Sequence, residues 1–208
     1  MFRNVNPVNT FNTTNLTPTA DTANTVEVTG EASAVSPVWP SMGRQIGAAV
    51  LFLAIVAAVA AIGSLSTMQH TEGWYTEVEK VAWSPPNAVF GPAWSLLYVL
   101  IALAGFLLWR AGFAGSGHRN RASGALTLYV VQLALNFAWT PIFFSGYPMI
   151  GEAAWWMALA VILTLIVFVV LLIGVARRSS KSAAWLLVPY LAWLIFASTL
   201  NAGIIALN

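Results

Sequence analysis

The stretch Ala153–Val175, which reads AAWWMALAVILTLIVFVVLLIGV, decides the fold. It contains no charged residue, and it has the roughly 20 apolar residues that a helix needs to cross a bilayer. Four more stretches have the same character: Gln45–Ser66, Val89–Trp109, Ala122–Phe144 and Ala183–Leu207. Backbone polar groups in hydrocarbon must be paired within the segment, so each stretch is predicted to be a helix. The sequence thus predicts an all-α integral membrane protein, a bundle of five transmembrane helices.

The composition of the whole chain favours the same class. Of the 208 residues, 59% are hydrophobic and 8% are charged, whereas soluble domains carry about 25% charged residues. A soluble domain of this size could not bury so much apolar surface. The few basic residues lie at the ends of the predicted spans, which indicates a lipid bilayer as the partner and no nucleic acid. The chain has no cysteine, which excludes disulfides and thiolate chemistry.

Residues 1–40 differ from the rest of the chain. They are rich in Asn, Thr and Pro, with scattered acids at Asp21, Glu27 and Glu31. Such a segment cannot bury enough apolar area to offset its ordering entropy, so we expect a disordered polar tail. It lacks the basic start and apolar run of a secretory signal. The membrane domain is predicted to cover residues 43–208.

Charged residues at the ends of the spans predict the orientation. Alternate connections collect the positive charge, and the other side carries most of the acids. The positive set is Arg44, Arg110, Arg119, Arg121, Arg177, Arg178 and Lys181, and the other set is Glu72, Glu77, Glu79, Lys80 and Glu152. By the positive-inside rule the N-terminus is expected in the cytoplasm and the C-terminus outside.

Polar and aromatic residues recur at helical spacing inside three spans. One face of each span carries them: Phe90, Trp94 and Tyr98 in the second; Gln132, Asn136, Trp139 and Phe143 in the third; and Tyr190, Trp193, Ala197 and Asn201 in the fifth. Amides at bilayer depth are costly without partners, so these faces are expected to point into the bundle. Four other tryptophans lie near helix ends and are predicted to form an interfacial belt: Trp109, Trp155, Trp156 and Trp185.

Two interpretations of these stripes remain open. The amides could bond across helices while the aromatic rings fill the core, or the stripes could line a pocket for a flat apolar ligand. Asn201 favours packing and Gln132 fits either interpretation. The group Trp94, Asn136 and Trp193 favours a pocket, because leucine would pack more simply at those positions.

Residues for acid–base, nucleophilic or metal chemistry are missing from the spans. The two histidines, His70 and His118, lie in predicted loops on opposite sides of the membrane. No span holds a carboxylate pair or a nucleophile beside a base. We therefore predict no metal site and no acid–base or hydrolytic catalysis.

Several motifs resemble the TspO/MBR family, the tryptophan-rich sensory proteins related to the mitochondrial translocator protein. The motifs are WSPP at 83–86, FGPAW at 90–94, QLALNFAW at 132–139, PIFF at 141–144 and PYLAW at 189–193. They occur in order, and the likeness covers about residues 43–208. The resemblance implies a prokaryotic plasma-membrane protein that is usually a homodimer. It also implies binding of porphyrins and other flat hydrophobic ligands, with no required cofactor, in a pocket closed by the first loop.

By matching position, the resemblance assigns ten residues to that pocket. They are Trp74, Tyr75, Pro85, Phe90, Trp94, Tyr98, Asn136, Trp139, Trp193 and Ala197. Trp94 and Trp193 also match the tryptophans associated in the family with photodegradation of porphyrins. The chain departs from animal members after Leu200, where the cholesterol-recognition consensus is absent. It also has Thr127 and Val131 where relatives have the small residues of a dimer interface.

The leading hypothesis is therefore a membrane protein that binds tetrapyrroles and acts in their sensing, transport or disposal. A second hypothesis is an enzyme that degrades porphyrins in light, with Trp94 and Trp193 as the reactive partners. A third is a structural or regulatory partner protein in which the stripes serve packing alone.

Overall fold

Five long helices form the membrane domain in the computed structural model, which describes residues 39–71, 73–113 and 122–208. The chain divides into two units, Met1–Ala34 and Val35–Asn208, and every described residue belongs to the second unit. The predicted tail of residues 1–40 lies almost entirely outside the described residues, as do Glu72, His118, Arg119 and Arg121.

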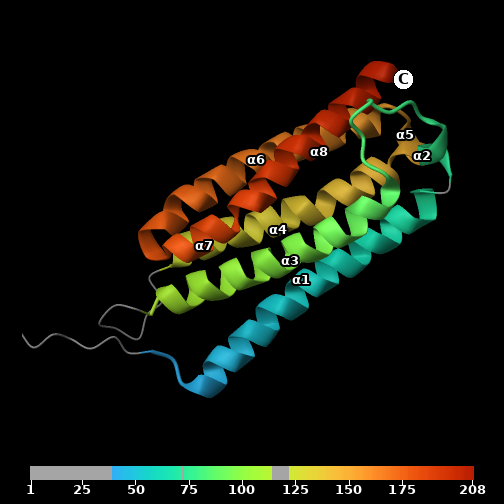
Figure 1. The fold of residues 1–208 in the computed structure, drawn as a ribbon. Coiled ribbons are helices and arrows are strands. Elements are labelled where there is room, and N and C mark those ends of the chain that lie inside the picture. Colours follow the sequence, from blue (N-terminus) through green and yellow to red (C-terminus); the bar gives the residue numbers. More distant parts are fainter. Residues whose placement is uncertain (1–38, 72, 114–121) are drawn as a thin grey trace, which may run out of the picture. The chain divides into compact units, whose positions relative to one another are not determined.

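The bounds of the helices confirm the five predicted spans. The helices are α1 (Met42–Thr71), α3 (Asn87–Ala111), α4 (Ser123–Phe144), α6 (Ala153–Ser179) and the pair α7 (Lys181–Leu186) and α8 (Val188–Leu207), with the short α2 (Trp74–Glu77) and α5 (Tyr147–Ile150) in the connections. Five segments are long and apolar enough to cross a membrane, and α7 and α8 together make the last of them. The spans lie roughly side by side, so α1 begins at one end of the bundle and α8 ends at the other (Figure 1).

The last span is broken at Leu187, where one continuous helix was predicted. Pro189 has no N–H, so the carbonyl group of Trp185 loses its usual helical donor four residues on. The N–H of Leu187 instead bonds within the last turn of α7, and the N–H of Leu191 resumes the helix by donating to the Leu187 carbonyl at 3.0 Å. The α1 helix also runs past the predicted Ser66, to Thr71.

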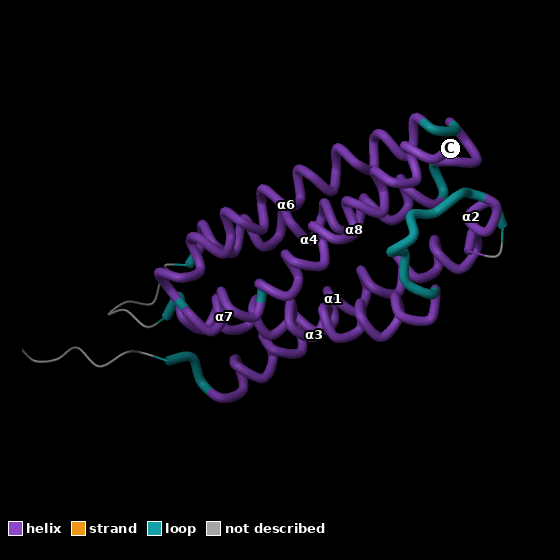
Figure 2. The backbone as a smooth tube through the Cα atoms, turned by 45° about the horizontal axis from the view of Figure 1, so that its top comes forward, coloured by secondary structure: helices purple, strands orange, loops and turns teal. Residues whose placement is uncertain are grey.

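The prolines before α3 end the first connection as predicted. Pro86 has extended backbone angles (φ −55°, ψ 143°), and α3 begins at the next residue. Residues 78–86 form the irregular part of this connection, drawn as loop in Figure 2. Three contacts tie it to α8. Glu79 and Asn208 exchange two hydrogen bonds, at 2.9 and 3.1 Å, and Trp83 Nε1 donates to Thr199 Oγ1 at 3.3 Å. The third is a close contact between Val81 and Gly203.

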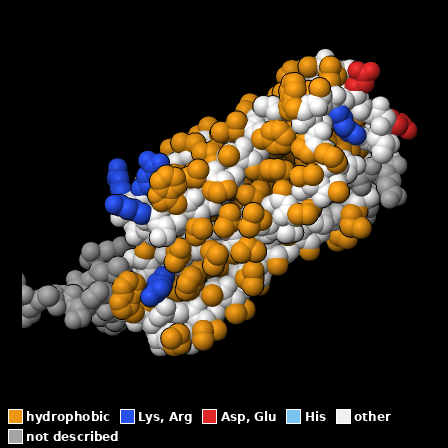
Figure 3. Space-filling model, viewed as in Figure 1, with side chains coloured by type: hydrophobic (Ala, Val, Ile, Leu, Met, Phe, Trp, Pro, Cys, Tyr) orange, Lys and Arg blue, Asp and Glu red, His pale blue; other side chains and the backbone are white. Residues whose placement is uncertain are grey.

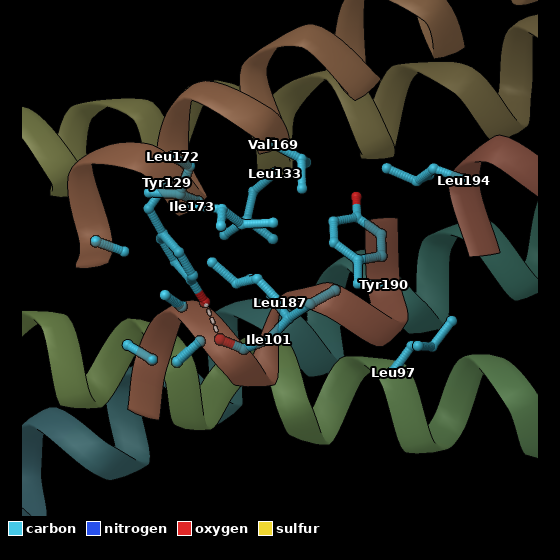
Figure 4. Close-up of a cluster of buried hydrophobic side chains, with 14 of the residues drawn as sticks. Leu97, Ile101, Tyr129, Leu133, Val169, Leu172, Ile173, Leu187, Tyr190 and Leu194 are labelled. Carbon is cyan, nitrogen blue, oxygen red and sulfur yellow. Dashed lines mark hydrogen bonds between the residues drawn. The ribbon is translucent and has the colours of Figure 1, made fainter. Parts of the chain in front are cut away.

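The main core fills the space between α3, α4, α6, α7 and α8 (Figure 4). Tyr129 of α4 is 2% exposed there, and its hydroxyl donates to the carbonyl oxygen of Ile101 at 3.1 Å. Phe52 of α1 packs against Tyr129 in an edge-to-face arrangement, with the ring centroids 5.5 Å apart. Gly105 of α3 faces this pair so closely that a methyl group there would lie 2.5 Å from Tyr129 Cζ. The junction of α1, α3 and α4 is therefore tightly packed.

The outer surface of the bundle is apolar along its length and charged at its ends (Figure 3). Leucine, valine and isoleucine side chains on every spanning helix are exposed, which is expected where lipid is the solvent. Most lysine and arginine side chains gather at one end, and the acidic side chains lie at the other together with a basic side chain (Figure 3). This arrangement is that of a multi-pass membrane protein.

Candidate ligand-binding site

The predicted stripes of α3, α4 and α8 face one another inside the bundle. The three amides are buried as expected, with exposures of 0% for Gln132, 4% for Asn136 and 1% for Asn201. Each stripe follows from helical spacing, since residues three and four apart share a face. The interior position of the amides is thus confirmed.

Asn136 joins the three helices by hydrogen bonds. Its Oδ1 accepts from the hydroxyl of Tyr98 on α3 at 3.2 Å, and its Nδ2 donates to the hydroxyl of Tyr190 on α8 at 3.0 Å. Asn201 makes a separate link, in which its Nδ2 donates to the carbonyl oxygen of Trp155 on α6 at 3.1 Å. Both amides therefore bond across helices, as the packing interpretation requires.

An aromatic cluster surrounds this network. Trp94 lies beside Tyr98 and Trp193, with ring centroids 5.2 and 6.3 Å away. Phe90 contacts the edge of Trp193 at 5.9 Å. The rings of α3 and α8 thus meet in the interior, on the side of α4 that carries Asn136.

A small enclosed space lies next to the cluster. Its lining residues come from four helices: Trp94, Asn136, Trp139, Ile162, Leu165 and Leu194. The gaps between atoms there add up to about 170 Å³, including space open to the outside, and a sphere the size of a water molecule does not fit in them. Pockets for drug-sized ligands measure about 300–1,000 Å³. The space between these six lining residues is therefore too small for such a ligand in this structure.

Several buried polar atoms of the α4 and α8 stripes lack a hydrogen-bond partner among the described residues. They are the indole nitrogens of Trp139 and Trp193 and both polar atoms of the Gln132 amide. Buried polar groups are almost always hydrogen-bonded, so each exception calls for an explanation. The indole N–H of Trp139, which lines the apolar space, could donate to a carboxylate or carbonyl oxygen of a ligand.

The two predicted loop residues, Trp74 and Tyr75, lie in a second cluster. Trp74 Nε1 donates to the carbonyl oxygen of Phe144 at 3.2 Å, and Tyr75 packs edge-on against the Phe144 ring at 5.4 Å. Neither residue lines the enclosed space. Trp139 connects the clusters, because its ring stacks on Phe143 at 5.3 Å while its other side lines that space. The loop residues therefore cover the end of α4.

Trp155 was expected in the interfacial belt, and this prediction is wrong. It is 1% exposed, and its ring stacks on Tyr147 with centroids 4.4 Å apart and planes 3° apart. Trp74 covers it from the loop at 5.7 Å. The belt assignment agrees better with Trp156 and Trp185, which are 59% and 71% exposed. The connections fold over the start of α6, which helix-end position alone does not reveal.

The remaining predicted residues take neighbouring places. Ala197 is 7% exposed and belongs to the main core, while Pro85 is half-buried at the end of the first connection. Sequence reasoning missed Ile162 and Leu165 of α6 and Leu194 of α8, which line the enclosed space. Aliphatic residues occur on every face of an apolar helix, so the sequence does not distinguish these three residues from lipid-facing ones.

Fold and site together define a class: a five-helix membrane protein with an aromatic, amide-bearing site between its helices. Comparison with known proteins names the family. The sequence profile of the TspO/MBR family matches residues 51–207, and the chain belongs to this family.

Individual relatives come from archaea, bacteria and animals. The chain is 40% identical to the tryptophan-rich protein TspO of Archaeoglobus fulgidus over 154 residues, which is 74% of this chain and 92% of the relative. It is 35% identical to the tryptophan-rich sensory protein of Cereibacter sphaeroides, covering 76% and 91% of the two chains. Against the human translocator protein it is 40% identical, covering 65% and 76%.

Proposed function

We propose that this protein binds tetrapyrroles and other flat hydrophobic ligands between α3, α4 and α8, and acts in their sensing, transport or disposal. The main support is that Trp94, Asn136 and Trp139 line one enclosed space, and that Trp193, whose indole nitrogen is unpaired, lies against Trp94. Aromatic walls with a few directional polar groups are the usual make-up of such sites. The words sensory and translocator in the names of relatives support the proposal.

Binding of a porphyrin requires the site to open, because not even a sphere the size of a water molecule fits in the enclosed space. The first connection is the segment best suited to move. Its hydrogen bonds to the helices are the Glu79–Asn208 pair, Trp83 to Thr199 and Trp74 to Phe144. A typical hydrogen bond contributes about 1 kcal/mol net. Release of this segment would also separate Trp74 and Tyr75 from the rings of Phe144 and Trp155, so ligand binding has to supply more than the hydrogen bonds alone.

Titration with protoporphyrin IX tests the proposal. The porphyrin should quench the intrinsic tryptophan fluorescence of the purified protein, and Trp94→Ala combined with Asn136→Ala should weaken binding at least about tenfold, which corresponds to about 1.4 kcal/mol. Trp156→Phe is the matched control, because Trp156 faces away from the interior. An unchanged titration curve for the double variant would show that the site is assigned wrongly. Absence of porphyrin binding to the parent protein would favour a packing role for the stripes.

Photodegradation of porphyrin is a second candidate function, favoured by the contact between Trp94 and Trp193. Their ring centroids are 6.3 Å apart in an edge-to-face arrangement, so one flat ligand could touch both. In the presence of oxygen, an excited porphyrin can oxidise a nearby tryptophan ring. This reaction needs no acid–base residue. Illumination of the complex should bleach the porphyrin bands more slowly with Trp94→Phe and Trp193→Phe. Equal rates in all variants would exclude a special role for these two residues.

For the topology, the charge distribution supports a cytoplasmic N-terminus and an outside C-terminus in a prokaryotic plasma membrane. Arg44, Arg110 and Arg178 lie at one end of the spans, and Glu152 lies at the other. The chain has no cysteine, so single cysteines report sidedness directly. In intact cells an impermeant maleimide should label Glu152→Cys and spare Arg178→Cys.

A further inference from the structure

A groove opens at the basic end of the bundle, where α6 is followed by α7. It is lined by Arg177, Lys181, Ala184, Trp185 and Val188. Spheres the size of a water molecule have about 160 Å³ of room in it, whereas none fits in the enclosed space between the helices. We propose that this groove binds the headgroup of an anionic phospholipid, with Arg177 and Lys181 contacting its phosphate.

The turn between α6 and α7 fixes the two cations in one place. Ser180 alone separates the helices and has an extended backbone (φ −154°, ψ 105°). Its N–H donates to the Ala176 carbonyl oxygen at 2.7 Å, and its Oγ accepts from the N–H of Ala183 at 3.2 Å. These bonds hold the last turn of α6 against the first turn of α7. Arg177 and Lys181 therefore approach the groove from two different helices.

The two cations lack a protein counter-ion in the described part of the chain. No carboxylate lies within salt-bridge distance of either Arg177 or Lys181 there, and both side chains are exposed. The described acids, Glu77, Glu79 and Glu152, lie at the opposite ends of the helices. Along α6, Glu152 and Arg177 are separated by roughly 35–40 Å at about 1.5 Å per residue. Both cations are therefore available to an external anion.

The other lining residues favour a lipid over a free phosphate ion. Lys181, Ala184 and Trp185 share one face of α7, and Val188 begins α8 directly after the break at Leu187. Trp185 is 71% exposed near the helix end, where tryptophan typically lies at the level of lipid headgroups. Val188 adds an aliphatic side chain to the lining, while Ala184 is 2% exposed at its base. Cations, an exposed indole and an aliphatic group suit the phosphate, glycerol region and acyl chains of a phospholipid, and basic pockets at helix ends recruit anionic lipids.

Lipid titration followed by native mass spectrometry tests the inference on the full-length protein in detergent. The first phosphatidylglycerol should bind more tightly than the first phosphatidylcholine. Arg177→Gln combined with Lys181→Gln should weaken phosphatidylglycerol binding about 30-fold, roughly fivefold for each cation. Both residues are exposed, so the variant should fold normally. The matched control is Arg178→Gln, which removes a neighbouring exposed charge outside the groove and should change binding less than about twofold.

Several results would overturn the inference. One is equal binding of the two lipids to the parent protein, and another is an equal loss of binding in the Arg178→Gln control. A third is complete displacement of the lipid by glycerol phosphate, which carries the charge without acyl chains and would indicate a soluble ligand. The last is a preference for phosphatidylglycerol that is absent from the parent protein and present in a variant with Glu27→Gln and Glu31→Gln. That result would identify the acidic N-terminal segment as the occupant of the groove. Failure of porphyrin binding leaves these outcomes unchanged, because the groove and the interhelical site share no residue.

Discussion

A methyl group at Gly105 should destabilise the junction of α1, α3 and α4. The Cβ atom of Gly105→Ala would lie 2.5 Å from Tyr129 Cζ and 2.7 Å from Phe52 Cδ1, which is too close for either ring to stay in place. Tyr129 is 2% exposed, and a shift of its ring would stretch the hydrogen bond from its hydroxyl to Ile101. The substitution therefore disturbs packing and a hydrogen bond together.

Three contributions decide the size of the effect. Overpacking in a filled core costs about 2 kcal/mol, and loss of the hydrogen bond from Tyr129 adds about 1 kcal/mol. Replacement of glycine by alanine within a helix stabilises the helix by about 1 kcal/mol. We expect Gly105→Ala to lower the free energy of unfolding by about 2 kcal/mol in total.

Unfolding by SDS in mixed micelles, followed by far-ultraviolet circular dichroism, measures this change. Gly174→Ala in α6 is the matched control, because no atom lies within 4 Å of its Cβ position. That variant should unfold at the same or a slightly higher SDS fraction. If Gly105→Ala and Gly174→Ala unfold at the same point, the described packing of Tyr129 against Gly105 is wrong.

Three further substitutions test other parts of the structure. Asn136→Leu removes both hydrogen bonds that link α3, α4 and α8. It should lower the free energy of unfolding in SDS by about 1 kcal/mol, near 0.6 kcal/mol for each bond. No change would mean that the network does not stabilise the bundle. Gly203→Leu should displace the first connection, which lies against this residue, and speed protoporphyrin association in stopped-flow fluorescence, whereas a slower rate would contradict opening at that segment. Trp155→Leu should lower the free energy of unfolding by about 3 kcal/mol, because it empties part of a filled core. Trp156→Leu, at a lipid-facing position, should be nearly neutral. Equal effects of the two substitutions would show that Trp155 is not more buried than Trp156.

The spans could be predicted from the sequence because a charge-free run of this length has few alternatives to a membrane helix. The interior direction of Gln132, Asn136 and Asn201 followed from the cost of an amide facing lipid. The break at Leu187 was not predicted. Proline within a membrane helix is often accommodated, so Pro189 does not by itself announce a break.

The site was only partly predictable for a related reason. Aromatic and amide stripes are conspicuous in an aliphatic helix, so Trp94, Asn136 and Trp139 stood out. Ile162 and Leu165 did not, because aliphatic residues cover every face of α6 and lipid accepts them as readily as the core does. The burial of Trp155 depends on how two connections fold over a helix end, and neither periodicity nor hydropathy records that long-range contact.

The stack of Tyr147 on Trp155, with Trp74 beside it, has a practical consequence. Tyr147 and Trp155 lie at the end of the bundle, and Trp74 belongs to the first connection. Departure of Trp74 would change the asymmetric surroundings of all three chromophores, and hence the near-ultraviolet dichroism of the unlabelled protein. The molecule thus carries an intrinsic optical reporter, through which the motion of a loop could be timed without attaching a dye.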